Sequence, residues 1–510
     1  MEMNYAKTVE KWGTLEVAVK GPKEGNPFCD QWIKGTFECK NEKKTVDGFY
    51  DGDGVYKVRF MPSFVDTYTF KIESSFQTES AEEVSGSFEA VAPSADNHGP
   101  VRVAGTYYLA YEDGKPYHCI GTTCYVWNLQ NEKLQEQTLK TLEENAFNKI
   151  RFCIFPKHYD YNLHEPITYP YEGTPCDTSE LNENNFAEYN GCAPGNDWDF
   201  TRFNPAHFQH IEECIKKLMA LGIQADLIVM HPYDRWGFSM MKAEDDDRYW
   251  KYVLARFSAY RNVWWSLANE YDLMHEKTLA DWERYAAIIC EKDPYHHLRS
   301  IHNCKAYYDY NLPWVTHCSI QRTETYRSSE LVNEWREKYH KPVVLDEICY
   351  EGNIQFGWGN ISGEEMTRRF WEAFCRGGYP GHGETYLSPD RILWWSHGGV
   401  LHGTSPERIK FLAKIMEEIP GLGVEPMPCK WDEVACRAAG FPARKDYFIY
   451  YYTFMRPSFR DFYFDDTTEY QVEIIDTWEM TITDGGIHKG QFRVQLPGKE
   501  YIAVRIKAVK

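Results

Sequence analysis

The chain has 510 residues, 43% of them hydrophobic, and carries a formal net charge of −20 at pH 7. This length suggests about three domains at about 150 residues each. The apolar content is enough for sizeable cores and argues against intrinsic disorder. The negative charge disfavours nucleic acids and anionic membranes as partners, because both carry charge of the same sign.

The cysteines and the N-terminal residues indicate the cellular compartment of the protein. The 15 cysteines are scattered, and no two form a Cys-x-x-Cys pair, which argues against a structural zinc site. The first twenty residues mix charges without an apolar segment, and no stretch approaches the about 18 apolar residues of a membrane span. We therefore expect a reduced, cytoplasmic protein.

The N-terminal part has the alternating pattern of half-buried β-strands. Apolar residues recur at every second position in Leu15–Val19, Tyr56–Phe60 and Tyr68–Ile72. Asp51–Gly54 is a turn signal between two such runs. Residues 91–101, with two prolines and a glycine, are typical of a linker. We predict a β-sandwich over residues 1–95.

Between residues 96 and 420, eight short apolar runs alternate with helical patterns. The predicted strands are Tyr117–Cys124, Lys149–Phe155, Gln224–Met230, Val263–Ala268, Leu298–His302, Cys318–Gln321, Pro342–Leu345 and Ile392–Trp395. The predicted helices are Glu132–Glu144, Pro205–Leu221, Arg248–Ser258, Leu279–Lys292, Ser328–Tyr339, Ser362–Arg376 and Ser405–Ile419. This alternation predicts a (β/α)8 TIM barrel. A doubly wound sheet is the alternative, but no glycine-rich fingerprint follows the first strand.

β patterning returns after Pro420. The predicted strands are Tyr447–Phe454, Tyr470–Ile475, Gln491–Leu496 and Tyr501–Ile506. They predict a second β-sandwich over residues 421–510, so the expected fold class is α/β, a barrel flanked by two β-domains.

Two glutamates follow apolar runs on opposite sides of the predicted barrel. Glu270 comes after the fourth run and Glu347 after the seventh. Barrel enzymes carry their chemistry at the carboxyl ends of the strands. Cleavage of a glycosidic bond needs one carboxyl group to protonate the leaving oxygen and another to attack the anomeric carbon. A single such glutamate would suit a solvated loop, whereas two at one rim favour catalysis.

The residues around both glutamates carry a family resemblance. Trp264–Glu270, ending in Asn269-Glu270, resembles the strand-four motif of clan A glycoside hydrolases, and Lys341–Glu347 resembles their strand-seven motif. The resemblance implies that Glu270 is the acid/base and Glu347 the nucleophile of a retaining hydrolase. Arg151 matches an arginine that the clan often carries on strand two. Arg151 and Asn269 would position the two glutamates or contact substrate.

The resemblance extends over most of the chain. Gly48–Gly54 and Tyr56–Pro62 resemble the DUF5060-type β-sandwich that precedes the barrel of some glycosidases. The barrel resembles relatives of the apiosidase-type family. These families act on diverse substrates, so the resemblance does not identify the sugar.

Further residues next to the predicted rim could contact a sugar. His231 and His302 follow strands and could bond sugar hydroxyls, and Trp127, Trp236 and Trp395 are candidate stacking platforms. Glu351, four residues after Glu347, stays open as an alternative nucleophile, although the clan pattern favours Glu347.

Taken together, the sequence predicts a retaining glycoside hydrolase acting on a small oligosaccharide or glycoside, with no cofactor and no metal. The alternatives are a carbohydrate-binding protein without activity and a metal-dependent barrel hydrolase. The histidines do not form the His-x-His pair that the latter usually carries on its first strand. A homo-oligomer stays open.

Overall fold

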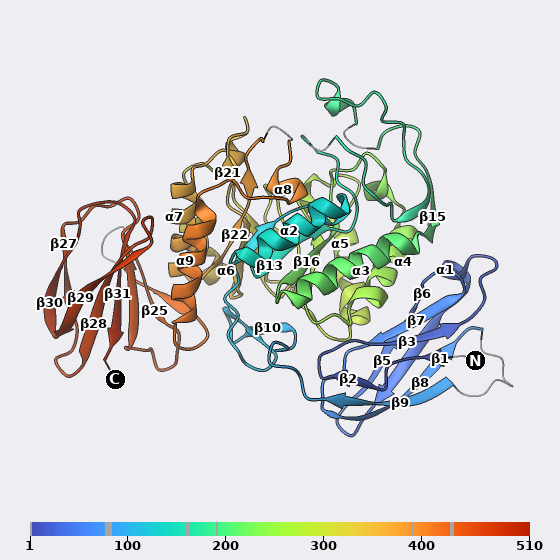
Figure 1. The fold of residues 1–510 in the computed structure, drawn as a ribbon, viewed down its shortest axis with the longest axis horizontal. Coiled ribbons are helices and arrows are strands. Elements are labelled where there is room, and N and C mark those ends of the chain that lie inside the picture. The colour runs from blue at the N-terminus through green and yellow to red at the C-terminus, as the bar shows by residue number, and fades with distance from the viewer. Residues whose placement is uncertain are drawn as a thin grey trace.

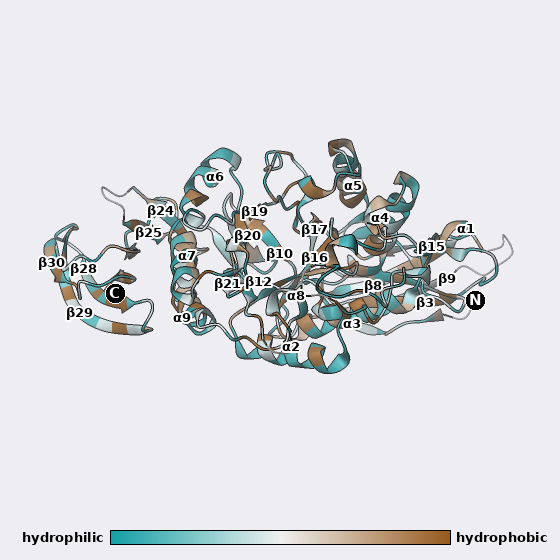
Figure 2. Cartoon of the chain, turned by 90° about the horizontal axis from the view of Figure 1, so that it is seen from above, coloured by the Kyte–Doolittle hydropathy of each residue, from teal (hydrophilic) through white to brown (hydrophobic). Residues whose placement is uncertain are grey.

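The computed structural model describes residues 3–76, 84–159, 161, 163–189, 192–388, 391–428 and 433–509. Three parts follow one another along the longest axis of the molecule (Figure 1). The N-terminal sheets lie at one end, the barrel lies in the middle, and the C-terminal sheets lie at the other end. The view from above in Figure 2 shows the same linear order.

The N-terminal part consists of two sheets packed face to face. One contains β1 (Met3–Asn4), β3 (Leu15–Lys20), β7 (Val55–Phe60) and β6 (Phe49–Tyr50) in that order. The other contains β2 (Thr8–Glu10), β9 (Val84–Val91), β8 (Asp66–Ser74), β4 (Ile33–Glu38) and β5 (Lys43–Asp47). Buried residues alternate along β3 and β8, as the sequence predicted, and also along β4. Phe37 of β4 stacks on Phe60 of β7 at 4.3 Å between the ring centroids, which joins the two faces.

The middle part is the predicted (β/α)8 barrel. Its parallel strands are β12 (Gly121–Thr123), β13 (Lys149–Cys153), β16 (Gln224–Met230), β17 (Val263–Ala268), β18 (Arg299–Ser300), β19 (Cys318–Gln321), β20 (Val343–Glu347) and β22 (Tyr379–His382). They pair in the order of the chain, and β22 pairs with both β12 and β20. A parallel bridge between His302 and Ser319 joins the remaining two neighbours, β18 and β19, and closes the barrel.

Helices cover the outside of the barrel (Figure 1). They are α2 (Glu132–Glu144), α3 (Pro205–Ala220), α4 (Ala243–Phe257), α5 (Leu279–Lys292), α6 (Val332–Tyr339), α7 (Gly363–Cys375) and α9 (Ser405–Glu417). Smaller elements accompany them: helices α1 (Pro27–Asp30) and α8 (Trp394–His397), and strand pairs β10 (Val101–Ala104) with β11 (Tyr108–Tyr111), β14 (Tyr171–Thr174) with β15 (Asp197–Phe203), and β21 (Glu351–Gly352) with β23 (Glu384–Thr385).

The prediction of the eighth strand was wrong. Ile392–Trp395 does not form a strand, because Trp394 begins the short helix α8. The eighth strand is β22, which contains Pro380 and Gly381, two residues that disfavour strands in isolation. Gly381 is required there, because a Cβ atom would lie 2.8 Å from the carbonyl oxygen of Leu345. The close approach of neighbouring strands therefore selects glycine at this position.

The C-terminal part is again antiparallel. A six-stranded sheet contains β24 (Val424–Met427), β25 (Val434–Ala438), β26 (Tyr447–Tyr451), β31 (Ile502–Ala508), β28 (Glu469–Asp476) and β29 (Thr481–Lys489). A second sheet pairs β27 (Phe459–Tyr463) with β30 (Gln491–Gln495). Trp371 of α7 packs on Tyr451 at 5.7 Å between centroids, so this sheet rests on the barrel.

Buried charges hold the N-terminal sheets against the barrel. Arg59 of β7 lies 2.6 Å from Glu212 of α3, and Asp51 lies 2.7 Å from Arg256 of α4. All four side chains are almost fully buried. Glu212 also bonds Arg256 at 2.7 Å, so the four residues form one network across the interface. A network of buried charges requires all its members, which makes the two parts interdependent.

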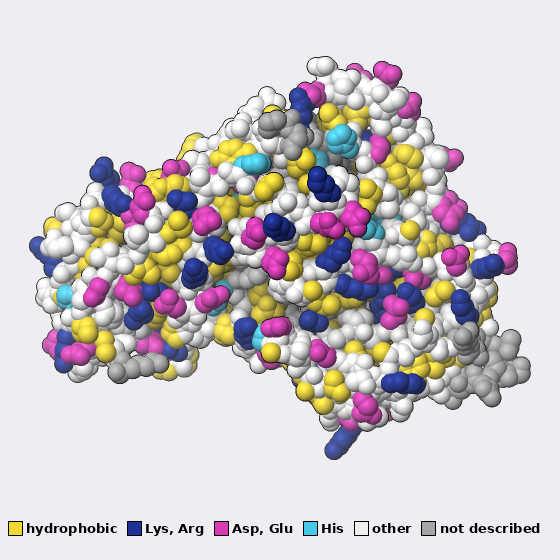
Figure 3. All heavy atoms as spheres, viewed as in Figure 1, with side chains coloured by type: hydrophobic (Ala, Val, Ile, Leu, Met, Phe, Trp, Pro, Cys, Tyr) yellow, Lys and Arg dark blue, Asp and Glu magenta, His cyan; other side chains and the backbone are white. Residues whose placement is uncertain are grey.

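The molecular surface is mixed in charge. On the face seen in Figure 3, acidic and basic side chains are interspersed. Within the described ranges, no helix combines the length and apolar character needed to cross a membrane.

Candidate active site

Glu270 and Glu347 lie at the carboxyl end of the barrel strands. Glu270 follows β17 in a left-handed backbone conformation, with φ of 53°, which turns the chain sharply at the strand end. Glu347 is the last residue of β20. Both residues are only 6% exposed, so their carboxyl groups lie in a site largely shielded from water.

The Glu347 carboxylate is surrounded by donors. The hydroxyl of Tyr125 donates a hydrogen bond to it. The guanidinium of Arg151 and Nε2 of His302 each lie 3.4 Å from its Oε1 atom. A carboxylate with a cation and hydrogen-bond donors around it is stabilised in its charged form.

The Glu270 carboxyl group has neutral partners. The hydroxyl of Tyr233 donates to its Oε2, the Asn269 side chain lies 3.1 Å from the same oxygen, and the Gln321 amide lies 3.0 Å from Oε1. None of these three side chains carries a charge. Glu270 therefore has hydrogen bonds to fix its position but no adjacent cation among these partners.

Two chains of contacts connect the glutamates. Asn269 contacts Glu270 through its amide nitrogen, and its Oδ1 accepts from Tyr125 at 3.1 Å and from Arg151 at 3.2 Å. On the other side, Gln321 bonds Glu270 and lies 3.0 Å from Nε2 of His302. The two carboxyl groups therefore share one polar network, and a displacement of either is felt by the other.

A buried ion cluster lies beside this network inside the barrel. Lys149 is 2.7 Å from both Asp226 and Asp346, and Arg151 lies 3.7 and 3.8 Å from the same two aspartates. Asp346 also accepts a hydrogen bond from Ser319. Each charge in the cluster has opposite charges next to it, which fixes the orientation of Arg151 below Glu347.

These surroundings drive the pKa values of the two glutamates apart. Burial raises the pKa of Glu347, but hydrogen bonding and charge from His302, together with Arg151 and Tyr125, lower it further, so the pKa lies below its ordinary value. For Glu270, burial and the negative charge of Glu347 raise the pKa above its ordinary value, against the hydrogen bonds from Tyr233 and Gln321. One carboxyl group favours the charged form and the other the protonated form.

The predicted sugar-contacting residues divide into two groups. His302 lies in the network, and Trp395 packs edge-on against Tyr125 at 5.7 Å between centroids. The other three have different contacts. Trp127 packs in the core against Phe152.

Trp236 and His231 also pack against other residues. Trp236 lies under the guanidinium of Arg235 in the same apolar core as Trp127. His231 is buried, and its Nε2 lies 3.4 Å from the carbonyl oxygen of Phe155. Among the described residues, neither donates a hydrogen bond to Glu270 or Glu347.

Glu351 has a different environment from Glu347. Its carboxylate accepts from the backbone N–H groups of Thr404 at 2.7 Å and Ser405 at 3.0 Å, and from both of their hydroxyls. Ser405 begins α9, so Glu351 binds the positive end of that helix. This position is typical of a structural carboxylate.

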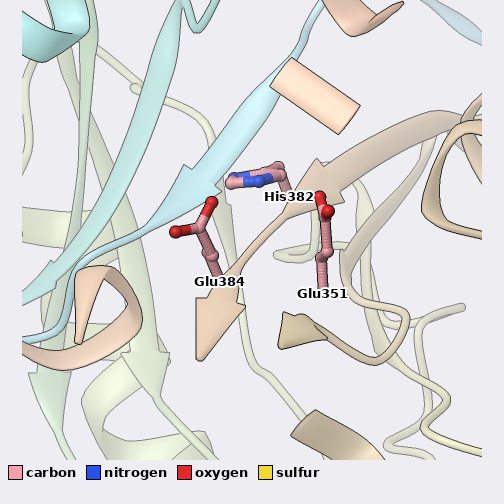
Figure 4. A group of neighbouring side chains, drawn as sticks. All are labelled: Glu351, His382 and Glu384. Atoms are coloured by element: carbon pink, nitrogen blue, oxygen red, sulfur yellow. The ribbon is translucent and has the colours of Figure 1, made fainter. Parts of the chain in front are cut away.

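Glu351 belongs to the one group of side chains, within the described part of the chain, whose types suit a metal ion. Glu351, His382 and Glu384 each place one donor atom within 4.8 Å of the others, and all three are buried. Figure 4 shows the glutamates on either side of the His382 ring. However, Glu384 already accepts from the N–H groups of His402 and Gly403, and Glu351 is bonded as above.

The protonation of this group also argues for a structural role. Burial lowers the pKa of His382 to about 3, and burial raises the pKa of Glu384 to about 8, with the Glu351 charge acting in the same direction. At neutral pH His382 is therefore neutral and Glu384 favours its protonated form. We therefore assign a structural role to the group, which anchors the start of α9.

The sequence analysis missed three residues that hold the carboxyl groups. Tyr125 follows β12, Tyr233 follows β16, and Gln321 ends β19. The rule that identified the glutamates, polar residues directly after a barrel strand, identifies all three when it is applied to every strand. Tyrosine hydroxyls and amides are less specific for catalysis than carboxylates, so these three residues do not stand out in the sequence alone.

Comparison with protein families assigns all three parts. The profile of the apiosidase-like catalytic domain matches residues 104–418. Two domains of unknown function flank it: DUF5060 matches residues 8–75 and DUF5605 matches residues 431–507. No curated protein matches the chain.

Solved structures share the fold. A crystal structure described as that of "a putative glycoside hydrolase from Bacteroides vulgatus ATCC 8482" has 38% sequence identity, covers 99% of this chain and 100% of its own, and gives a TM-score of 0.90. A glycoside hydrolase family 5 structure from the same organism has 16% identity, covers 80% of this chain and 94% of its own, and gives a TM-score of 0.59. The first shares all three parts, whereas the second shows the fold alone.

Proposed function

The chain belongs to the apiosidase-like catalytic domain family, and from this we propose that it is a retaining glycoside hydrolase with Glu347 as nucleophile and Glu270 as acid/base. One observation carries the assignment of roles. The two buried carboxyl groups share a network, yet the pKa of Glu347 is lowered and that of Glu270 is raised. Opposed shifts of this kind distinguish a nucleophile from a general acid.

In the first step, a carboxylate oxygen of Glu347 attacks the anomeric carbon. The bond between that carbon and the leaving oxygen breaks, and Glu270 donates its proton to the leaving oxygen. A glycosyl ester on Glu347 results, and Glu270 becomes a carboxylate. Loss of the negative charge on Glu347 removes the repulsion that raised the pKa of Glu270, which suits Glu270 to its next role as a base.

In the second step, Glu270 accepts a proton from water, and the water oxygen attacks the anomeric carbon. The ester bond to Glu347 breaks, and both carboxyl groups return to their starting states. Tyr125 and Arg151 remain beside Glu347 to stabilise its charge as it leaves. Two displacements at one carbon give overall retention of configuration.

For the substrate, we propose a small glycoside or oligosaccharide cleaved from its end. Both carboxyl groups are 6% exposed, which suits a short substrate entering a recess more than a polymer lying across an open cleft. The cysteines within the described ranges are free, which suits a reducing compartment, where polysaccharides are not available. We therefore propose a cytoplasmic role in the metabolism of imported sugars.

A panel of aryl glycosides tests the proposed function. The wild type should release the aryl group from at least one sugar. Glu347→Gln should release none, and Glu270→Gln should act only on substrates with good leaving groups, although both variants remain folded. Proton NMR of the first sugar formed should show the anomeric configuration of the substrate. Faster internal cleavage of a polymer than of the matching short glycoside would contradict the proposed substrate class.

A further inference from the structure

The ammonium group of Lys157 lies among four aromatic rings. Its Nζ atom is 4.0 Å from the ring centroid of Tyr125, 4.4 Å from that of Tyr159, 4.5 Å from that of Tyr233 and 4.3 Å from that of Trp395. Lys157 is 2% exposed. Cations within about 6 Å of a ring centroid are attracted to the ring, and more strongly where water is excluded. We call these four rings the aromatic cage.

The aromatic cage joins loops from different parts of the barrel. Tyr125 follows β12, Tyr159 follows β13 in the same loop as Lys157, Tyr233 follows β16, and Trp395 lies in α8. The rings also contact one another: Tyr159 lies 4.8 Å from Tyr233 and 5.2 Å from Trp395 between centroids. The ammonium group of Lys157 therefore contacts a ring from every segment that contributes to the aromatic cage.

Two of the four rings hold the candidate catalytic residues. Tyr125 donates its hydroxyl hydrogen bond to Glu347, and Tyr233 donates to Glu270. A cation on the face of a phenol ring draws electron density from it, which makes the hydroxyl a stronger donor. The same positive charge also favours the ionised form of a nearby carboxyl group.

We propose that Lys157 is a positioning residue that acts on Glu347 through Tyr125 and on Glu270 through Tyr233. The inference rests on the proposed function for its catalytic meaning. One lysine would then influence both carboxyl groups, because its ammonium group contacts both of the tyrosines that bind them.

Other titratable groups face Lys157 within the described residues. His231, His158 and Cys153 feel its charge: burial lowers the pKa of His231 to about 3, and Lys157 acts in the same direction. Both histidines are therefore neutral at pH 7. Arg151 and His302 also lower the pKa of Glu347. Removal of Lys157 leaves both of them in place, and its effect should be partial.

Lys157→Met removes the charge while keeping a long apolar side chain. Without the cation, both carboxyl groups lose stabilisation of their ionised forms, so both pKa values rise. The acid limb of the pH profile of kcat/KM reports Glu347, and the alkaline limb reports Glu270. Both limbs should move to higher pH, by about half a unit, and kcat should fall about tenfold. Lys157→Arg keeps the charge and should leave both limbs in place.

Substitution of the two tyrosines tests whether Lys157 acts on the glutamates through them. In a Tyr125→Phe background, Lys157→Met should shift the acid limb by less than half of its shift in the wild type, and Tyr233→Phe should reduce the alkaline shift in the same way. Unchanged limbs in an active Lys157→Met enzyme, equal shifts in Lys157→Arg, or full shifts in both tyrosine backgrounds would each overturn the inference.

A second readout needs no substrate. A carboxyl group with a lowered pKa contributes stability that is present above its unfolded pKa and is lost as the pH falls. Lys157→Met should therefore reduce the difference in melting temperature between pH 7 and pH 4, and a background that carries both Glu347→Gln and Glu270→Gln should make this reduction smaller. Should the glycoside screen fail, this measurement still decides the inference, because an unchanged difference in Lys157→Met contradicts it.

Discussion

The guanidinium of Arg151 lies 3.4 Å from a carboxylate oxygen of Glu347, and both side chains are buried at the end of the barrel. Asp226 and Asp346 hold Arg151 from the other side. Because the aspartates fix its position, the charge of Arg151 is directed at Glu347 whether or not a substrate is present. Together with the hydrogen bond and charge of His302, this relationship holds the pKa of Glu347 below its ordinary value.

Arg151→Met should raise the pKa of Glu347, because the cation that favours its charged form is lost. The acid limb of the pH profile of kcat/KM should move to higher pH, and activity at the optimum should fall about a hundredfold. Arg151→Lys, which keeps a charge, should lose less. Identical acid limbs in Arg151→Met and the wild type would show that Arg151 does not act on Glu347.

Glu270→Ala should remove protonation of the leaving oxygen. Aryl glycosides with poor leaving groups should lose about a thousandfold in kcat/KM, whereas those with good leaving groups should be spared. Added azide should restore turnover, because it attacks the glycosyl ester without needing a base. Equal losses for every leaving group, with no rescue by azide, would argue against Glu270 as the acid/base.

Glu351 and Glu347 should respond differently to the same substitution. Glu351→Gln places an amide against the N–H groups at the start of α9, and should cost about 2 kcal/mol of stability while sparing activity in the folded protein. Glu347→Gln should abolish activity instead. Urea denaturation and kcat of both variants check this, and an inactive but fully stable Glu351→Gln protein would reverse the two assignments.

Arg59→Met should weaken the interface between the N-terminal sheets and the barrel. It leaves the buried Glu212 with Arg256 alone, at a cost of about 2–3 kcal/mol. Lys43→Met is the matched control, because Lys43 and Glu38 form an ion pair that is largely exposed and should change stability little.

Expression of residues 97–510 alone extends this test. The truncated chain lacks Arg59 and Asp51, so Glu212 and Arg256 lose their partners across the interface. We expect a lower melting temperature and reduced solubility. A truncated protein with the melting temperature and catalytic efficiency of the full chain would show that the N-terminal sheets are an independent appendage.

The sequence predicted the strands that are buried on both faces and the helix that has one apolar face. β16 and β17 are buried on both faces and read as continuous apolar runs, and α5 combines an apolar face with a capping box at Thr278. The bounds predicted for all three match the structure. The eighth strand was missed because it contains a glycine and a proline, which disfavour strands locally. Its pairing with the neighbouring strand β20, and not its local sequence preference, determines its conformation. Long-range packing of this kind leaves no periodic signal in the sequence.

The candidate site was predictable where chemistry requires a particular residue type. Carboxyl groups at the rim are informative alone, so Glu270 and Glu347 could be named. Trp127 and Trp236 illustrate the limit, because a tryptophan after a strand is as suitable for the core as for a sugar platform, and here both lie in the core. Lys157 could not be identified from the sequence, because its proposed role depends on contacts with four rings. These rings come from three other segments and from its own loop.

The most direct test of the double displacement is covalent trapping. An activated 2-fluoro glycoside of the sugar preferred in the aryl glycoside screen should inactivate the enzyme by forming a stable glycosyl ester. Fragmentation of the labelled peptide by mass spectrometry should then place the sugar on Glu347. A label on Glu351, or turnover without any label and with inversion of the first product, would contradict the account.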